Sequence, residues 1–216
     1  MTRILIAVPT YESITPDTYK SLWDMDKGGN ECLFEFIRGY DCATARNKCA
    51  EKALELNADY LLMVDSDITV PRDALVNLLS HNVDVVSGYY AHRNRDNEYT
   101  GNTCACRLCN ANGKPYFDYP IESEYTADDM REMRMRGEYL IRIHGGGMGC
   151  ILIRTSVFDE VRFPWFDWVN CNDDQSRKIL SEDLYFCEQL INEEIPLYVD
   201  TRVSCGHLFR HIQHVN

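Results

Sequence analysis

Apolar runs alternate with amphipathic, helix-like segments along residues 1–90 of the chain. The apolar runs predict strands at 4–9, 32–37, 60–64 and 83–88. Helix-start residues predict helices at 15–27, from the Asp41 cap onward, and from Pro71 to Leu79. Because strands that alternate with helices usually pair in parallel, this half predicts an α/β fold with helices flanking the sheet.

The second half of the chain has a less regular pattern. Residues 91–137 are polar, and we interpret them as an insertion with a charged helix around 126–136. The elements expected after it are a strand, a glycine turn and a strand over 140–154, a short helix from Thr155, a helix from the Ser181 cap to Asn192, and a strand at 196–200. Since no repeat or low-complexity linker interrupts the chain, we predict a single domain over 1–216.

The charge balance narrows the range of partners. The chain has 22 Lys and Arg against 34 Asp and Glu, a formal charge of -12, which disfavours binding to nucleic acid and to anionic membranes. Its apolar runs are too short to span a bilayer, and MTRILIAVPT lacks the apolar core of a signal peptide. We therefore expect a cytoplasmic protein without a transmembrane segment.

Ten cysteines are consistent with reduced thiols in such a compartment. The CACRLC cluster places Cys104, Cys106 and Cys109 close together, but the paired CxxC pattern of zinc sites is missing. Cys104 and Cys106 also fit the inward face of a strand, where cysteine behaves as a small apolar residue. We predict that this cluster holds no zinc.

The segment LLMVDSDITV raises the main chemical question, because a buried strand ends in two carboxylates. Ligands of open α/β sheets bind at the carboxyl ends of the strands, so Asp65 and Asp67 lie at the functional edge. With one residue between them, both can face one crevice and share a divalent cation. The alternative is a helix-capping aspartate beside a solvated neighbour.

One enzyme family with this pattern is the haloacid-dehalogenase-like phosphatases, whose nucleophilic aspartate lies in D-x-D-x-T. DSDIT (65–69) fits that pattern. In that family, however, the motif usually follows the first strand, whereas here a strand–helix–strand–helix unit precedes it. The later lysine and acidic pair of the family have no convincing counterpart, since Asp173 and Asp174 do not follow a strand.

A second resemblance covers most of the chain. The segments ILIAVPTYE (4–12), DCATARNKCA (41–50), DSDITVPRDALVNLL (65–79), HGGGMGCILIRTSVFDEV (144–161) with PWF (164–166), SEDLYFCEQL (181–190) and CGHL (205–208) occur in this order. They resemble nucleotide-sugar glycosyltransferases with a GT-A fold, especially family 2-like members from bacteria and phages. A single DxD would be weak evidence, whereas the ordered set is specific.

This resemblance implies a Rossmann-like mixed sheet flanked by helices, with a nucleotide-binding half at 1–90 and an acceptor and sugar side at 91–216. It also implies a metal-dependent transfer of a sugar from a nucleoside-diphosphate sugar, with UDP as the expected nucleotide, to an unknown acceptor. The metal would be Mn²⁺ or Mg²⁺, which stabilises the charge that develops on the leaving phosphate.

The same resemblance implies roles for individual residues. The nucleotide and donor site would comprise Pro9, Tyr11, Glu12, Asp41, Arg46, Asp65, Ser66, Gly146 and Gly147. Asp67 and His207 would bind the metal, with Asp65 facing the ribose or the metal. Asp183 would be the base of an inverting transfer, Glu182 would hold the acceptor or order the loop, and Trp165 would lie on the acceptor side.

Each of these roles has a structural alternative. Arg46 could form a salt bridge, and the glycines of 145–147 could form a plain hairpin turn instead of approaching the sugar. His207 could be a surface residue, and the acids at 182 and 183 could merely complement the start of a helix. A catalytically silent protein that binds nucleotide sugars is the non-enzyme alternative.

Overall fold

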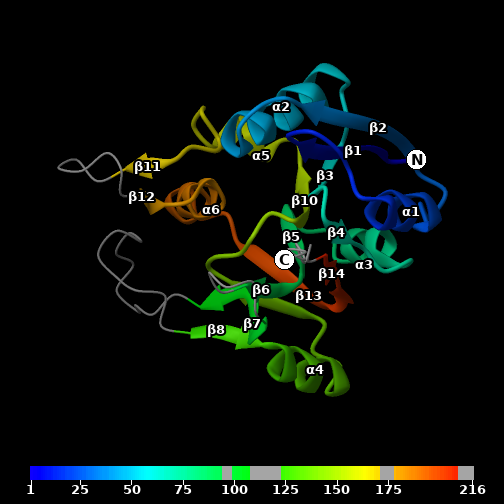
Figure 1. Cartoon of the computed structure of the whole chain (residues 1–216), viewed down its shortest axis with the longest axis vertical. Coiled ribbons are helices and arrows are strands. Elements are labelled where there is room, and N and C mark those ends of the chain that lie inside the picture. Colours follow the sequence, from blue (N-terminus) through cyan, green and yellow to red (C-terminus); the bar gives the residue numbers. More distant parts are fainter. Residues whose placement is uncertain (94–98, 108–122, 171–177, 209–216) are drawn as a thin grey trace, which may run out of the picture.

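The computed structural model describes residues 1–93, 99–107, 123–170 and 178–208, and its centre is a seven-stranded mixed sheet (Figure 1). In spatial order the strands are β2 (Glu31–Arg38), β1 (Arg3–Thr10), β3 (Tyr60–Val64), β10 (Cys150–Arg154), β5 (Val85–Tyr89), β13 (Leu197–Ser204) and β9 (Leu140–Ile143). All of them run in one direction except β10 and β9. The predicted α/β class with a mixed sheet is confirmed.

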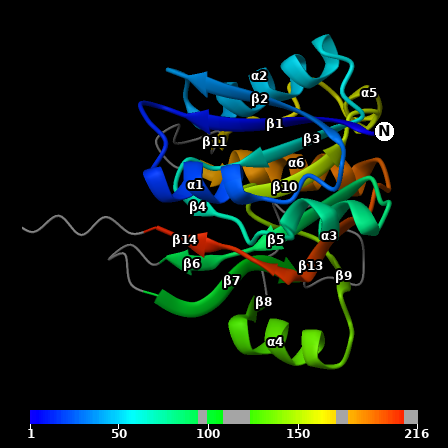
Figure 2. The ribbon, with the colours of Figure 1, turned by 90° about the vertical axis from the view of Figure 1, so that its right-hand side faces the viewer.

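Helices cover both faces of this sheet (Figures 1 and 2). One face carries α1 (Pro16–Asp24) and α3 (Ala74–Ser80), whose apolar residues pack in one core cluster. The other face carries α2 (Cys42–Glu55), α5 (Val157–Glu160) and α6 (Glu182–Asn192), which form a second cluster. Every residue of β3 is buried because the strand is covered on both sides, as its continuous apolar sequence predicts.

The helix starts follow the predicted capping residues in most places. The side chains of Thr15 and Asp41 accept hydrogen bonds from the backbone N–H groups of Thr18 and Thr44. The start predicted at Pro71 is wrong, because residues 71–73 form a turn before α3. Among the described residues, no helix has the length and apolar character needed to cross a membrane. The cytoplasmic location stays a prediction.

The remaining elements are short. A three-stranded sheet contains β6 (Ala91–Arg93), β7 (Tyr99–Arg107) and β8 (Ser123–Thr126), and it is followed by α4 (Ala127–Met135). Two further pairs are β4 (Ile68–Thr69) with β14 (Gly206–His207) and β11 (Val169–Asn170) with β12 (Lys178–Leu180). The predicted insertion therefore contributes a small sheet and the expected charged helix, and its Ala105, Tyr125 and Met130 join the core on the α2 side.

The glycine segment between β9 and β10 is not a hairpin turn, so that alternative is wrong. β5 and β13 separate the two strands in the sheet. Ile143 pairs with Leu197 at the start of β13, whereas Cys150 pairs with Val64 at the end of β3. Residues 144–149 therefore cross the sheet from the amino edge to the carboxyl edge of its parallel strands.

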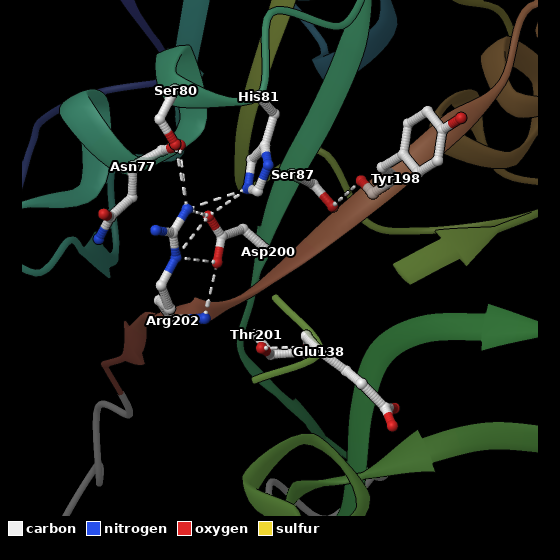
Figure 3. Close-up of polar contacts among 9 residues, drawn as sticks. All are labelled: Asn77, Ser80, His81, Ser87, Glu138, Tyr198, Asp200, Thr201 and Arg202. Atoms are coloured by element: carbon white, nitrogen blue, oxygen red, sulfur yellow. Dashed lines mark hydrogen bonds and ion pairs between the residues drawn. The ribbon is translucent and has the colours of Figure 1, made fainter. Parts of the chain in front are cut away.

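A buried ionic network fastens α3 to β13 (Figure 3). The carboxylate of Asp200, which is fully buried, lies 2.7 Å from Arg202 Nη2 and 2.7 Å from His81 Nε2. Arg202 also donates to the Asn77 carbonyl and to the Ser80 hydroxyl at the carboxyl end of α3. A cation suits this position because carbonyl groups are left without helix partners there. The network thus holds the strand that leads into β14.

We expect Asp200→Ala to lower the free energy of unfolding by about 3 kcal/mol, because it leaves Arg202 without its buried partner. The matched control is Asp84→Ala, which removes a half-exposed aspartate paired with Arg154 at 2.9 Å and should cost less than about 1 kcal/mol. Urea unfolding followed by circular dichroism measures both. Equal losses in the two variants would contradict a structural role for the network.

Candidate functional site

A pocket of about 260 Å³ opens at the carboxyl edge of the parallel strands. Its lining residues are Pro9, Thr10, Tyr11, Tyr40, Cys42, Ala45, Asp65, Ser66 and Asp67. The structure thus brings together the loops after β1, β2 and β3 and the first turn of α2. Of the residues expected at a nucleotide site, Pro9, Tyr11, Asp65 and Ser66 share this pocket with the expected metal ligand Asp67.

Glu12 and Asp41 lie outside that lining. Glu12 lines a neighbouring pocket of about 420 Å³, which shares Thr10 with the first. Asp41 caps α2 and accepts hydrogen bonds from both the backbone N–H and the hydroxyl of Thr44, which lower the pKa of its carboxyl. The carboxylate of Asp41 is therefore already used by its own helix.

Arg46 is buried and forms ion pairs with both acidic motifs. Its terminal nitrogens lie 3.1 and 3.2 Å from the two carboxylate oxygens of Asp65, and its Nε lies 3.6 Å from Glu182 Oε1. Nη1 also donates to the Met148 carbonyl. The side chain is absent from the pocket lining. The salt bridge that competed with a nucleotide contact is therefore present, and the nucleotide contact stays a prediction.

Glu182 and Asp183 occupy the first turn of α6, next to this ion pair. Glu182 is buried against Arg46, whereas Asp183 is partly exposed. Burial raises the pKa of Asp183 to about 6; the charge of Arg46 opposes this shift and that of Glu182 adds to it. Asp183 is therefore ionised at neutral pH, yet it is a stronger base than an ordinary aspartate. Glu182, expected to hold the acceptor or order the loop, pairs with Arg46, and its role toward an acceptor stays a prediction.

His207 and Asp67 meet through pairing between segments far apart in the sequence. β14 pairs with β4, so that His207 lies opposite Ile68, and His207 Nε2 is 3.5 Å from Asp67 Oδ2. Gly206 permits this approach, because a Cβ there would lie 2.4 Å from the Thr69 hydroxyl. The two expected metal ligands therefore lie together, and one of them, Asp67, lines the pocket.

The chemistry of this pair fits a divalent cation. His207 Nδ1 lies 3.0 Å from the Ala91 carbonyl, so in the neutral ring Nδ1 donates and the lone pair is on Nε2, facing a carboxylate oxygen. No group of three or more His, Cys, Asp and Glu side chains in the described residues forms a complete metal site. Two protein ligands suit Mg²⁺ or Mn²⁺, which complete their shell with phosphate and water oxygens.

The glycines after β9 leave space for an aromatic residue that the sequence analysis missed. A Cβ on Gly147 would lie 2.0 Å from the Tyr90 hydroxyl, and one on Gly149 would lie 2.8 Å from the Tyr90 ring. A Cβ on Gly146 would lie 3.3 Å from Ile143. Tyr90 and Tyr40 could have been found from sequence, because each follows a predicted strand at the carboxyl edge of the sheet.

Trp165 lies in the core and is only 7% exposed. Its indole N–H donates to the Phe158 carbonyl, and its backbone N–H donates to Asn47 Oδ1. Trp165 therefore packs in the core, and its place on the acceptor side stays a prediction.

Part of the thiol prediction lies outside the described residues. Cys104 is described, and burial raises the pKa of its thiol to about 12. The side chain of Cys106 and the whole of Cys109 are outside, as are His211 and His214, which we expected at the surface. The absence of zinc stays a prediction.

Comparisons with known proteins identify the type of fold. No family model and no curated protein matches the sequence. The solved structure of A197 from STIV superposes with a TM-score of 0.60 at 16% identity, over 96% of this chain and 86% of that chain. GalNAc-T7, solved with UDP, GalNAc and Mn²⁺, superposes with a TM-score of 0.54 at 13% identity, over 97% of this chain and 44% of that chain. At these identities the likeness shows the fold alone. The chain has a GT-A-like fold.

Replacing Arg46 with methionine should lower the free energy of unfolding by about 3 kcal/mol or more, because Asp65 and Glu182 would lose their shared cation. Arg46→Lys should recover only part of this loss, since an ammonium cannot reproduce the fork. Arg154→Met, which breaks a more exposed ion pair, is the control. A loss below about 1 kcal/mol in Arg46→Met, measured by urea unfolding, would leave the guanidinium available for a ligand instead.

Proposed function

We propose that the protein is a metal-dependent glycosyltransferase that takes a sugar from a nucleoside-diphosphate sugar, with UDP as the expected nucleotide. The observation that carries the proposal is the contact of His207 with Asp67, 3.5 Å apart, where Asp67 lines the strand-edge pocket. A GT-A-like fold with this pocket at its carboxyl edge supports the same class. The GalNAc-T7 neighbour was solved with UDP, GalNAc and Mn²⁺, which supports the choice of donor and metal.

The roles of the side chains follow from their places in the site. Pro9, Tyr11 and Ser66 line the pocket and would bind the nucleoside, with the 72% exposed ring of Tyr11 free to cover it. Asp67 and His207 would hold Mn²⁺ or Mg²⁺, and the contact between Nδ1 and the Ala91 carbonyl keeps Nε2 directed at that place. A divalent ion bound there neutralises charge on the leaving diphosphate.

Asp183 would take the proton of the acceptor hydroxyl in an inverting transfer. A carboxylate with a pKa of about 6 is ionised at neutral pH and accepts the proton as the hydroxyl becomes acidic in the transition state. Arg46 and Glu182 would act through Asp183, because the charge of Arg46 lowers its pKa and the charge of Glu182 raises it.

The phosphatase alternative requires Asp65 to act as a nucleophile. Both carboxylate oxygens of Asp65 are within 3.2 Å of Arg46, so their lone pairs are already stabilised by a cation. This arrangement opposes nucleophilic attack and favours Asp65 as a residue that shapes the pocket. The silent binder remains the second alternative, and it differs from the transferase only in turnover.

The metal assignment can be tested by binding alone. UDP and GDP should raise the thermal unfolding midpoint of the wild type much more with Mn²⁺ than without it. Asp67→Ala and His207→Ala should lose this metal-dependent shift while keeping the midpoint of the free protein. Asp128→Ala, an exposed acid on α4, is the matched control. Unchanged metal-linked shifts in both site variants would remove this pair from the metal site.

The base assignment predicts both a rate and a pH profile. Asp183→Asn should slow nucleotide release from the bound sugar donor by roughly 100-fold, with donor affinity nearly unchanged. In the wild type the rate should fall as the pH drops through about 6, because protonation of Asp183 removes the base. Glu182→Gln should move this fall to lower pH, since it deletes a charge that raises the pKa of Asp183. A normal rate in Asp183→Asn would place the base elsewhere, and binding without turnover in the wild type would favour the silent binder.

A further inference from the structure

Tyr90 adjoins three parts of the proposed donor site, which are the glycine segment 144–149, the strand end at Asp65, and His207. It directly follows β5, and its hydroxyl accepts a hydrogen bond from the Gly149 N–H at 3.2 Å. The Gly149 carbonyl in turn accepts from the Asp65 N–H at 3.0 Å. The ring of Tyr90 packs edge-to-face against His207, with centroids 5.3 Å apart. The hydroxyl is therefore linked through Gly149 to the acidic strand end, and the ring that carries it packs on the proposed metal ligand.

The proton of this hydroxyl is not used by a hydrogen bond within the described part of the chain. The oxygen accepts from Gly149, and no described residue accepts the phenolic hydrogen. A tyrosine hydroxyl carries its proton at neutral pH. The side chain is only partly buried. One hydrogen bond thus holds the Tyr90 hydroxyl in place, and its O–H group can still act as a donor.

A diphosphate in this site needs such donors. The guanidinium of Arg46, the cation next to the pocket, is already paired with Asp65 and Glu182. The chain as a whole carries a formal charge of -12, so bulk charge does not attract an anion. Besides a divalent ion, neutral hydrogen-bond donors near this place can bind the phosphate oxygens.

We propose that the Tyr90 hydroxyl donates a hydrogen bond to a phosphate oxygen of the donor's diphosphate, an inference that rests on the proposed function. Gly147 and Gly149 are then glycines because a side chain at either would displace this phenol. The ring packs on His207 and the hydroxyl is linked through Gly149 to the Asp65 strand end, so both parts of the side chain adjoin the proposed diphosphate site.

The test compares Tyr90→Phe with wild type in calorimetric titrations of UDP in the presence of Mn²⁺. The variant keeps the ring and loses the donor, so its affinity for UDP should fall about 10-fold, the usual scale for a hydrogen bond to a charged group. Tyr60→Phe, a buried tyrosine at the opposite end of the sheet that packs on Arg154, should bind as wild type. Binding of Mn²⁺ alone, followed by electron paramagnetic resonance, should be the same in all three proteins.

A second variant keeps the tyrosine but moves it. Gly147→Ala, whose Cβ would lie 2.0 Å from the hydroxyl, should weaken UDP binding to a similar extent. Wild-type affinity for UDP in Tyr90→Phe would overturn the inference and leave the proposed function standing. Loss of Mn²⁺ binding in that variant would also overturn it, because the phenol would then act through His207. Failure of the wild type to bind UDP or GDP at all would overturn the proposed function, and the Tyr90 contact with it.

Discussion

The arrangement of the site depends on one buried cation, the guanidinium of Arg46. It lies between Asp65 at the end of β3 and Glu182 at the start of α6, and thereby joins α2 to both acidic motifs. Two carboxylates this close to the core would be unstable without a partner. Arg46 contacts both oxygens of Asp65 and lies within ion-pair distance of Glu182, although its Nε and Glu182 Oε2 form no hydrogen bond among the described residues. Asp65 and Glu182 can therefore hold these positions only because α2 places Arg46 between them.

The ion pairs of Arg46 give the two acids of each acidic motif different surroundings. In the first motif Asp65 is bound to Arg46, while Asp67, two residues on, faces His207. In the second, Glu182 faces Arg46, while Asp183 is partly exposed with a pKa of about 6. In each pair one acid forms an ion pair with Arg46, and its neighbour is the acid to which we assign a chemical role. The proposed metal ligand and the proposed base thus owe their positions to residues that need not touch a substrate.

Long-range pairing completes the site around this centre. His207 reaches Asp67 because β14 pairs with β4, and β14 continues from β13, which the Asp200–Arg202 network fastens to α3. Residues 144–149 cross the sheet and bring Gly149 to Asp65 and Tyr90. The surroundings of Asp65 and Asp67 are therefore assembled from stretches of chain that lie far apart in the sequence.

The sequence by itself determined the local elements and the edge of the sheet at which the chemistry lies. Continuous apolar runs such as YLLMV specify doubly covered strands, capping residues such as Thr15 and Asp41 start helices, and DSD marks a carboxyl strand end. These signals are local, so they could be read without the fold. Only the tertiary structure decided the partners: that Arg46 meets carboxylates, that Trp165 is buried, that the glycines make room for Tyr90, and that β9 and β10 lie apart. The reason is physical, since a side chain's partner depends on which distant segments pack against it, and residue order along the chain does not encode that contact locally.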